Sequence, residues 1–308
     1  MDQQREELMR RKAQRERVRR QKQRRALVIF CLTVVVIVTG VVWVRVASSK
    51  RAAPTSVAKQ SKTAGAAAEN QFASYPNYES ENQDRYRAYA KLHSDLAPKD
   101  VIWRVNQRLD LTLFDDAEML TEQDLNDDLL IIVNKYHRVP DDYTPDDLTD
   151  TSDGCSLRAV AAHAFDQMKE AAAQEGYTLR AVSGFRSVAY QDGLYQGYLA
   201  QDTQAEVDRY SARAGYSEHH TGLAVDVFGS IDGLNEFETT PEYQWVKENG
   251  AKYGFIIRYT TQWEGVTGYL NEPWHLRYVG EKAAKEMKEN NIGTLEEYRD
   301  RYVLHQPE

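Results

Sequence analysis

The sequence predicts an α+β domain, in which a small antiparallel sheet is flanked by helices, preceded by one transmembrane helix. Three observations predict this architecture. Residues 26–44 form an uncharged apolar run, the segment after them is poor in large apolar side chains, and from residue 83 onward helical and strand patterns are mixed. Helices and short strands without a repeated strand–helix–strand order favour an α+β fold over a parallel-sheet fold.

The amino-terminal segment predicts a membrane anchor. Residues 1–25 contain eleven Lys and Arg against four Asp and Glu, and the nineteen residues that follow carry no charge. A membrane-spanning helix needs about 20 mostly apolar residues. Because basic residues favour the cytoplasmic side, we expect residues 1–25 to be cytoplasmic and residues 26–46 to cross the bacterial cell membrane once. A cleaved signal peptide is the alternative.

The remaining chain is expected to consist of a linker and one extracytoplasmic domain. Residues 47–82 are rich in Ala, Ser, Lys, Gln and Asn, which predicts a flexible linker. The domain is expected to cover residues 83–308. The whole chain has a formal net charge of −8, and because its basic excess lies at the amino terminus, the domain is acidic and no nucleic-acid partner is expected. Cys155 is the only cysteine of the domain, which therefore has no internal disulfide. We expect a monomer, and a disulfide between two chains through Cys155 is the alternative.

The helices are predicted from apolar periodicity and from signals at their ends. Small and apolar residues recur at helical spacing between residues 156 and 175, and Gly176 ends that helix. Pro241 favours the start of another helix. Thr294 and Glu297 have the spacing of a capping box. The expected helices are 156–175, 188–213, 240–250, 281–289 and 294–303.

Strands are predicted where β-branched and aromatic residues form short apolar runs. One of these runs ends on an acidic residue, Asp226. Burying a carboxylate is costly unless a positive group meets it. That group is either a metal ion or an arginine, for which Arg258 and Arg277 are the candidates. The expected strands are 129–134, 177–187, 223–226, 255–259 and 272–280.

Two histidines and one aspartate form a candidate metal site. His219 lies seven residues before Asp226, and Glu272 lies three residues before His275. In a regular strand, positions 272 and 275 face opposite sides, but Pro273 disturbs the pairing, which allows both side chains to enter one cleft. Two histidines and one carboxylate leave the fourth position of a catalytic zinc ion open for water. A nearby carboxylate that is not a ligand can accept a proton from that water.

These patterns resemble the zinc D-alanyl-D-alanine carboxypeptidases of the VanY type. The family pattern Ser-x-His-x-x-Gly-x-Ala-x-Asp is met at residues 217–226, Glu-x-Trp-His at 272–275, and Ser-Gly-(Tyr/Phe)-Arg-Ser at 183–187, with Gln191 at the expected offset. The resemblance covers roughly residues 100–285. It implies the DD-peptidase/hedgehog-like zinc peptidase fold, one zinc ion per chain, and removal of the C-terminal D-alanine from peptidoglycan stem peptides.

The resemblance also implies a role for each matching residue. Glu272 would act as a general base and then as the acid that protonates the leaving amine. Arg186 would polarise the scissile carbonyl and bind the developing oxyanion. Ser217 and Gln191 would hydrogen-bond the substrate peptide. Zinc would be bound by His219, Asp226 and His275.

Several alternatives stay open. The same zinc residues serve D,D-cleavage of pentapeptides and L,D-cleavage of tetrapeptides, so the sequence does not distinguish these two activities. A non-catalytic module that binds cell-wall peptides is a further alternative, as is a metal-free domain in which Asp226 pairs with an arginine. His220 is a second candidate for the ligand position of His219, and otherwise is expected behind the ligands or at the surface. Glu218 is expected to be solvent-exposed.

Overall fold

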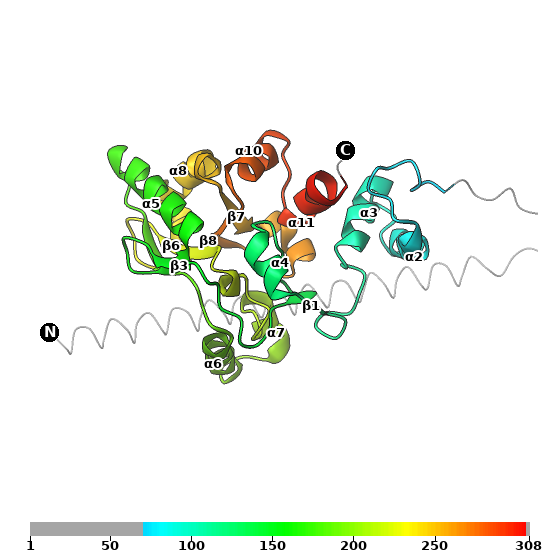
Figure 1. Ribbon diagram of the computed structural model, residues 1–308, viewed down its shortest axis with the longest axis horizontal. Helices are drawn as coiled ribbons and strands as arrows, with labels where there is room; N and C mark the ends of the chain where they lie inside the picture. Colours follow the sequence, from blue (N-terminus) through cyan, green and yellow to red (C-terminus); the bar gives the residue numbers. More distant parts are fainter. Residues whose placement is uncertain (1–69, 306–308) are drawn as a thin grey trace, which may run out of the picture. The chain divides into compact units, whose positions relative to one another are not determined.

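The computed structural model describes residues 70–305, which form a mixed α/β domain with small sheets flanked by helices (Figure 1). This agrees with the predicted small sheet flanked by helices. Within this range, every helix is too short or too polar to span a bilayer. The predicted cytoplasmic segment, the predicted membrane span and most of the predicted linker lie outside the described residues.

The main sheet has four antiparallel strands in the order β5-β6-β8-β7. Two small two-stranded sheets accompany it: β1 pairs in parallel with β2, and β3 pairs in antiparallel with β4. The strands are β1 (Glu118–Met119), β2 (His137–Arg138), β3 (Leu148–Asp150), β4 (Ser156–Arg158), β5 (Arg180–Ser183), β6 (Ala224–Phe228), β7 (Phe255–Tyr259) and β8 (Glu272–Tyr278).

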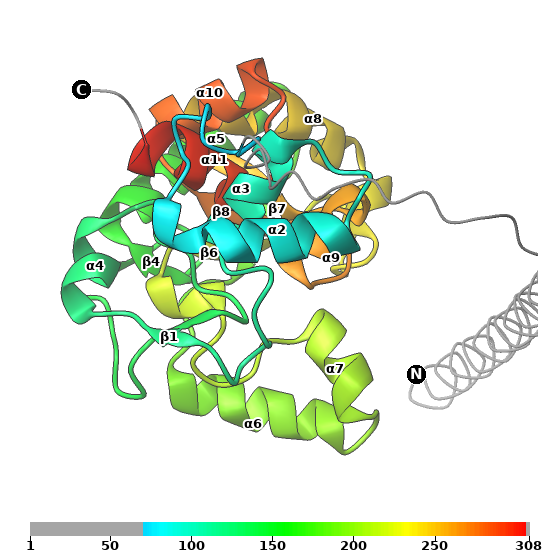
Figure 2. The same cartoon turned by 90° about the vertical axis from the view of Figure 1, so that its right-hand side faces the viewer.

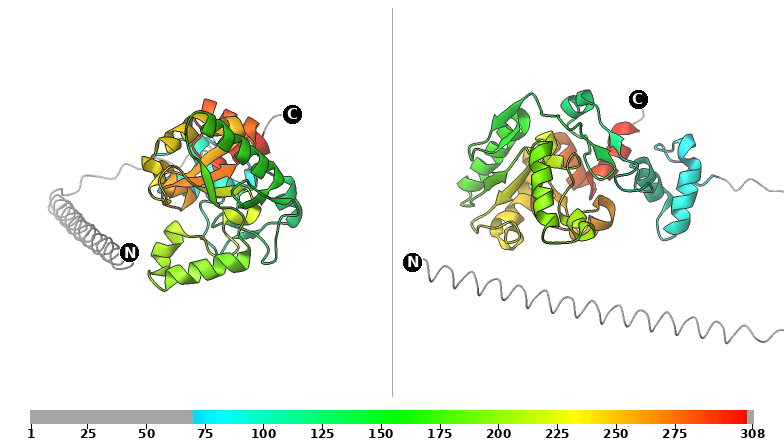
Figure 3. Two further views of the ribbon diagram at one scale, coloured as in Figure 1. Left: turned by 90° about the vertical axis from the view of Figure 1, so that its left-hand side faces the viewer. Right: turned by 90° about the horizontal axis from the view of Figure 1, so that it is seen from below.

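The helices lie around this sheet. In Figure 2, α6 and α7 form a hairpin at one edge of the domain, away from α5 and α8, and the left-hand view of Figure 3 shows the same separation. The helices are α2 (Gln83–Leu92), α3 (Pro98–Asn106), α4 (Glu122–Asp127), α5 (Ala159–Gln174), α6 (Val188–Leu199), α7 (Gln204–Tyr210), α8 (Pro241–Asn249), α9 (Glu264–Thr267), α10 (Glu281–Glu289) and α11 (Leu295–Tyr298).

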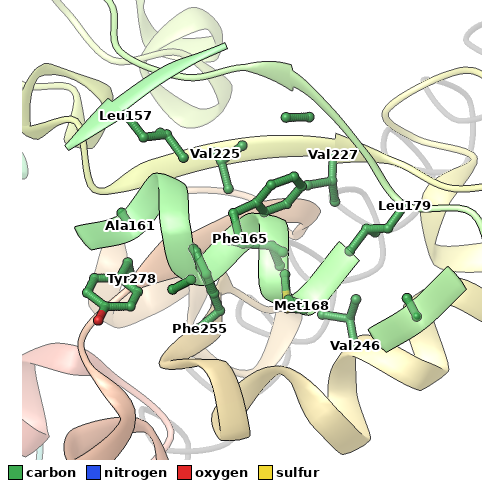
Figure 4. Close-up of a cluster of buried hydrophobic side chains, with 14 of the residues drawn as sticks. Leu157, Ala161, Phe165, Met168, Leu179, Val225, Val227, Val246, Phe255 and Tyr278 are labelled. Carbon is green, nitrogen blue, oxygen red and sulfur yellow. The ribbon is translucent and has the colours of Figure 1, made fainter. Parts of the chain in front are cut away.

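One face of the main sheet packs against α5 and forms the largest hydrophobic core. Phe165 and Met168 of α5 lie beside Val225 and Val227 of β6 (Figure 4), and all four side chains are fully buried. Successive side chains of a strand point to opposite faces. Asp226, which lies between the two valines, therefore faces away from this core, so that the sheet separates the core from the candidate site.

The predicted strand at 129–134 is wrong. The carbonyl groups of Leu129 and Ile131 accept hydrogen bonds from the buried guanidinium of Arg277, so they do not take part in a strand ladder. Asn134 forms only an isolated bridge, with His137. Ile131, Ile132 and Val133 are nevertheless buried, in hydrophobic clusters with residues of α4, α10 and α11. Apolar periodicity alone cannot distinguish such a buried irregular run from a strand.

Two predicted helices have different bounds in the structure. The expected helix 188–213 is divided into α6 and α7, because the side chain of Thr203 accepts a hydrogen bond from the backbone N–H of Glu206 and so caps a new helix. The helix expected at 156–175 begins only at Ala159, since residues 156–158 pair as β4. The predicted ends agree closely at α8 and α10. The helix expected at 294–303 is an α-helix only over α11, and it continues as a π-helix over Arg299–Leu304.

Packing begins before the predicted domain boundary at residue 83. The side chain of Phe72 is 1% exposed, and its ring centroid lies 5.5 Å from that of Tyr86. The side chain of Asn77 donates to the buried carboxylate of Asp300, which also accepts from Asn106 at 2.8 Å. These contacts connect residues 70–82 with α3 and with the carboxyl-terminal turns of the domain.

Burial of His137 gives the domain a stability that depends on pH. Burial, with a smaller contribution from Arg108, lowers the pKa of His137 to about 4, below its ordinary value of about 6.5. The unfolded chain therefore takes up the proton first, and we expect stability to fall as the pH falls from about 6.5 toward about 4. Urea denaturation of chelator-treated protein at pH ~7.5 and pH ~5 measures this effect. Between these two pH values, the free energy of unfolding should fall by roughly 2 kcal/mol more in the wild type than in His137→Gln. Equal losses would contradict this.

Candidate metal centre

The three predicted ligands, His219, Asp226 and His275, lie together on the face of the sheet opposite the core. One possible ligand atom from each lies within 4.8 Å of the others, and all three residues are buried. Asp226 Oδ1 is 3.3 Å from His219 Nε2 and 3.5 Å from His275 Nδ1. Ligands that are each about 2 Å from a tetrahedral zinc ion lie about 3.3 Å from one another. The spacing of these atoms therefore fits one ion.

The two carboxylate oxygens of Asp226 have different surroundings. Oδ2 accepts a hydrogen bond from the guanidinium of Arg186. Oδ1 is buried and has no hydrogen-bond donor among the described residues. Burial would raise the pKa of Asp226, but His219 and Arg186 lower it well below its usual range, so the group is an anion. A buried carboxylate oxygen without a partner is rare, and a bound cation would satisfy it.

Strand pairing explains why Asp226, His275 and Glu272 converge. Asp226 lies opposite His275 in the β6–β8 pair, and directly opposite residues share one face of a sheet. Between β7 and β8 the register shifts just before Tyr259, which pairs with Glu272. This bulge lies where Pro273 was expected to disturb the pairing, and bulges redirect side chains. Glu272 Oε2 consequently lies 3.4 Å from His275 Nδ1.

The ring of His219 is oriented by the turn between β5 and α6. Nδ1 of His219 is 2.7 Å from the carbonyl oxygen of Gly184, so Nδ1 carries the proton and Nε2 faces Asp226 with its lone pair. Burial, reinforced by Arg186, lowers the pKa of His219 to about 4, which keeps the ring neutral, as a metal ligand must be. Gly222, at φ 66°, turns the chain between the two ligands, in the left-handed region that glycine favours.

Gly184 fills a position where a larger residue does not fit. A Cβ atom there would lie 2.3 Å from the carbonyl oxygen of Ser156. We expect Gly184→Ala to lower the free energy of unfolding by roughly 1–3 kcal/mol and to weaken zinc binding, because the carbonyl that orients His219 must move. Gly193 on α6 has nothing within 4 Å of its Cβ position, so Gly193→Ala is expected to be neutral or to stabilise by up to about 1 kcal/mol. Urea denaturation measures the free energy of unfolding of each variant, and zinc titration measures its zinc affinity. Equal values for Gly184→Ala and Gly193→Ala would contradict this prediction.

Arg186 lies at the edge of a cavity of about 430 Å³ that opens onto the candidate ligands. Its Nε donates to Ser183 Oγ at 2.9 Å, and its Nη2 donates to Asp226 Oδ2. Its backbone N–H donates to the carbonyl oxygen of His219 at 3.2 Å. The guanidinium is thus held beside the ligands by contacts from both β5 and β6.

Ser217 and Gln191, the predicted substrate-binding residues, also line this cavity. Ser217 Oγ accepts a hydrogen bond from the backbone N–H of His219. Gln191 Nε2 donates to the carbonyl oxygen of Ala212 at 2.8 Å, while its Oε1 has no donor among the described residues. The walls come from α6, α7, the sheet and the loop between α9 and β8, and include Leu194, Tyr198, Tyr210, Tyr259, Tyr269 and Trp274.

Glu218 is buried, so the prediction that it is solvent-exposed is wrong. Its exposed fraction is 2%. Its Oε1 accepts from Arg258 Nε at 2.7 Å and from Arg277 Nη1 at 3.0 Å. Burial would raise the pKa of Glu218, but the two guanidinium groups lower it well below its usual range. The alternative in which one of these arginines neutralises Asp226 is therefore also wrong, although the arginines inside two apolar strands were a visible signal of a buried anion.

His220 does not join the candidate ligands. It is fully buried, and its Nδ1 is 2.7 Å from the carbonyl oxygen of Arg186. Its Nε2 accepts a hydrogen bond from the backbone N–H of Gly215 at 3.1 Å. Because both ring nitrogens are used, His220 supports the turn that carries Arg186 and does not replace His219 as a ligand.

The sequence of this chain is similar to one family of known proteins. The family model VanY, described as D-alanyl-D-alanine carboxypeptidase, matches residues 154–281. Over 184 residues the chain is 42% identical to YodJ of Bacillus subtilis (strain 168), which is provisionally named a carboxypeptidase. This alignment covers 56% of the chain and 67% of YodJ.

Two further proteins are similar over comparable lengths. The chain is 33% identical over 195 residues to a D-alanyl-D-alanine carboxypeptidase of Enterococcus faecium, which covers 59% of the chain and 60% of that protein. The chain thus spans about two thirds or less of these curated relatives. Among solved structures, that of the LD-carboxypeptidase LdcB is similar with a TM-score of 0.55 and 37% identity, over 62% of this chain and 93% of that one.

Proposed function

Because the chain belongs to the VanY family of D-alanyl-D-alanine carboxypeptidases, we propose that it is a zinc-dependent carboxypeptidase that releases the terminal D-alanine of peptidoglycan stem peptides. The observation that carries this proposal is the convergence of His219, Asp226 and His275, with Glu272 beside them, at a cavity of about 430 Å³. Three protein ligands are typical of catalytic zinc sites, whereas structural sites are closed by four.

In the proposed reaction, Glu272 moves the proton. Zinc held by the three ligands supplies a Lewis acid at the scissile carbonyl and lowers the pKa of water. The carboxylate of Glu272 accepts a proton from the attacking water as its oxygen bonds to the carbonyl carbon. The C–N bond then breaks, and Glu272 returns the proton to the amine of the leaving D-alanine. Burial raises the pKa of Glu272, which suits a group that must both accept and release a proton.

Arg186 supplies positive charge where negative charge develops. Its guanidinium is fixed at the cavity edge by Ser183 and Asp226. As the carbonyl oxygen of the substrate becomes an oxyanion, a preorganised cation stabilises it more strongly than mobile water does. Gln191 Oε1, which has no hydrogen-bond donor among residues 70–305, would accept a hydrogen bond from an N–H of the substrate peptide.

The substrate is tested with two stem peptides. We expect the purified protein to convert a pentapeptide that ends in D-Ala-D-Ala to the tetrapeptide, with loss of one alanine by mass spectrometry. L,D-cleavage is the second candidate, because the LD-carboxypeptidase LdcB is similar over 93% of its length. Conversion of a tetrapeptide to a tripeptide, with the pentapeptide left intact, would establish that candidate. Release of alanine from neither peptide would contradict a carboxypeptidase function.

The chain is further proposed to be a monomer that is anchored in the bacterial cell membrane through residues 26–46, with residues 1–25 in the cytoplasm and the domain outside. The uncharged run and its basic flank support this proposal. Deletion of residues 26–46 should move the protein from the membrane fraction to the soluble fraction. Protease added to intact spheroplasts should degrade the domain of the unmodified protein, and protection would contradict the proposed orientation.

A further inference from the structure

Glu218 forms a buried ion cluster directly behind the candidate ligands. Its side chain is 0% exposed. One oxygen, Oε1, accepts hydrogen bonds from Arg258 and Arg277. The other, Oε2, lies 3.3 Å from Nε2 of His275. The carboxylate therefore uses one oxygen for the arginines and the other for the ring of a candidate ligand.

The cluster extends to the carboxyl-terminal part of the domain. Arg258 Nη1 and Nη2 donate to the two oxygens of Glu296 at 3.0 and 2.6 Å, and Glu296, which belongs to α11, is 1% exposed. The remaining donors of Arg277 are bound by backbone carbonyl groups, including that of Tyr278. Two guanidinium groups and two carboxylates thus balance in charge, which is required because an unpaired buried charge is strongly destabilising.

The contact with Glu218 determines which nitrogen of His275 is free. An ionised carboxylate can only accept a hydrogen bond, so Nε2 of His275 carries the ring proton. When the ring binds zinc as the neutral imidazole, Nδ1 presents its lone pair to the space that it shares with Asp226 Oδ1, 3.5 Å away. Carboxylates behind a ligand histidine fix its tautomer and ring orientation and raise its basicity, and their loss typically weakens metal binding by about 10- to 100-fold.

We propose that Glu218 is a positioning residue of the zinc site, which holds His275 through Nε2 so that Nδ1 faces the ion, and that Glu296 holds Glu218 in place through Arg258. This inference rests on the proposed zinc site, but not on the substrate or the reaction. It assigns a role to α11, which lies beyond the segment matched by the family model.

Zinc affinity tests the proposal without substrate. Competition between the full-length protein and a chromophoric chelator should give a zinc Kd that is about 10- to 100-fold weaker in Glu218→Gln than in the wild type. Glu296→Gln, which does not touch His275, should weaken zinc binding by less than Glu218→Gln. Asp300→Asn is a matched control, because Asp300 is a fully buried carboxylate that binds Asn77 and Asn106. Its zinc Kd should equal that of the wild type.

An unchanged Kd in folded Glu218→Gln, or an equal weakening in Asp300→Asn, would overturn the proposal. A second measurement does not depend on any variant folding. In zinc-loaded wild-type protein with ¹⁵N-labelled histidine, His275 should show a metal-bound Nδ1 and a protonated Nε2, whereas His219 should show the opposite pattern. Coordination of zinc through Nε2 of His275 would overturn the proposal, whatever peptide the enzyme cleaves.

Discussion

Replacement of Glu272 by alanine is expected to lower the turnover number for D-alanine release by about 10²- to 10⁴-fold, while one zinc ion stays bound per chain. Glu272 Oε2 lies 3.4 Å from His275 Nδ1, but Glu272 is not needed to complete the set of three ligands. Its loss therefore removes the group that accepts and returns the proton and leaves the ligands in place. Single-turnover assays with the stem pentapeptide and elemental analysis for zinc measure the two effects.

The control for this change is Glu289→Ala, on an exposed position of α10, which should keep wild-type turnover. Glu272→Gln separates shape from proton transfer, because the amide has nearly the size of the carboxylate but cannot accept a proton in the same way. It should be as inactive as the alanine variant. If Glu272→Ala retained full activity, the proposed base would be wrong. If the wild type bound the peptide without turnover, the non-catalytic binding module would be the better account.

The local part of the site could be predicted from the sequence, because short motifs determine it. The sequence distance from His219 to Asp226 spans one turn and half a strand, and Gly222 at positive φ permits that turn. The expectation that Pro273 would bring Glu272 and His275 to one side depended only on strand alternation and the effect of proline on pairing. The register shift in β8 occurs at this place.

The parts that depend on distant contacts could not be predicted. The neighbours of Glu218 in the sequence are polar, which is typical of an exposed segment. Its burial depends on Arg258, forty positions away, and on Arg277. Arginines in apolar strands indicate a buried anion, but Asp226 and Glu218 both qualify, and only the sheet register distinguishes them. Arg277 pairs across the sheet with Ala224, which places it beside Glu218. The irregular path of residues 129–134 depends on the same arginine, since its guanidinium binds their carbonyl groups.

Removal of the ion, or of one ligand, is expected to abolish activity and the stability that zinc confers. A ligand that binds only the folded state at 100 times its Kd stabilises it by about 2.7 kcal/mol, which for a domain of this size corresponds to a rise in Tm of about 5–10 °C. We expect zinc to raise the Tm of chelator-treated wild-type protein by this amount. His219→Ala should show no such rise at the same zinc concentration, because its site keeps only two ligands.

His163→Ala is the control for this measurement, because His163 is exposed on α5 and lies on the helix that packs against the opposite face of the sheet. It should respond to zinc as the wild type does. A metal-free domain makes the contrary prediction: neither chelator nor zinc would change its Tm. Asp226 would then be neutralised by Arg186 and by a protonated His275, whose Nδ1 lies 3.5 Å from Asp226 Oδ1. Burial alone would lower the pKa of His275, but Glu218 and Glu272 raise it to about 9. Since a neutral His219 with its proton on Nδ1 supplies no donor to Oδ1, a Tm that rises with zinc identifies the ion as the partner of Oδ1.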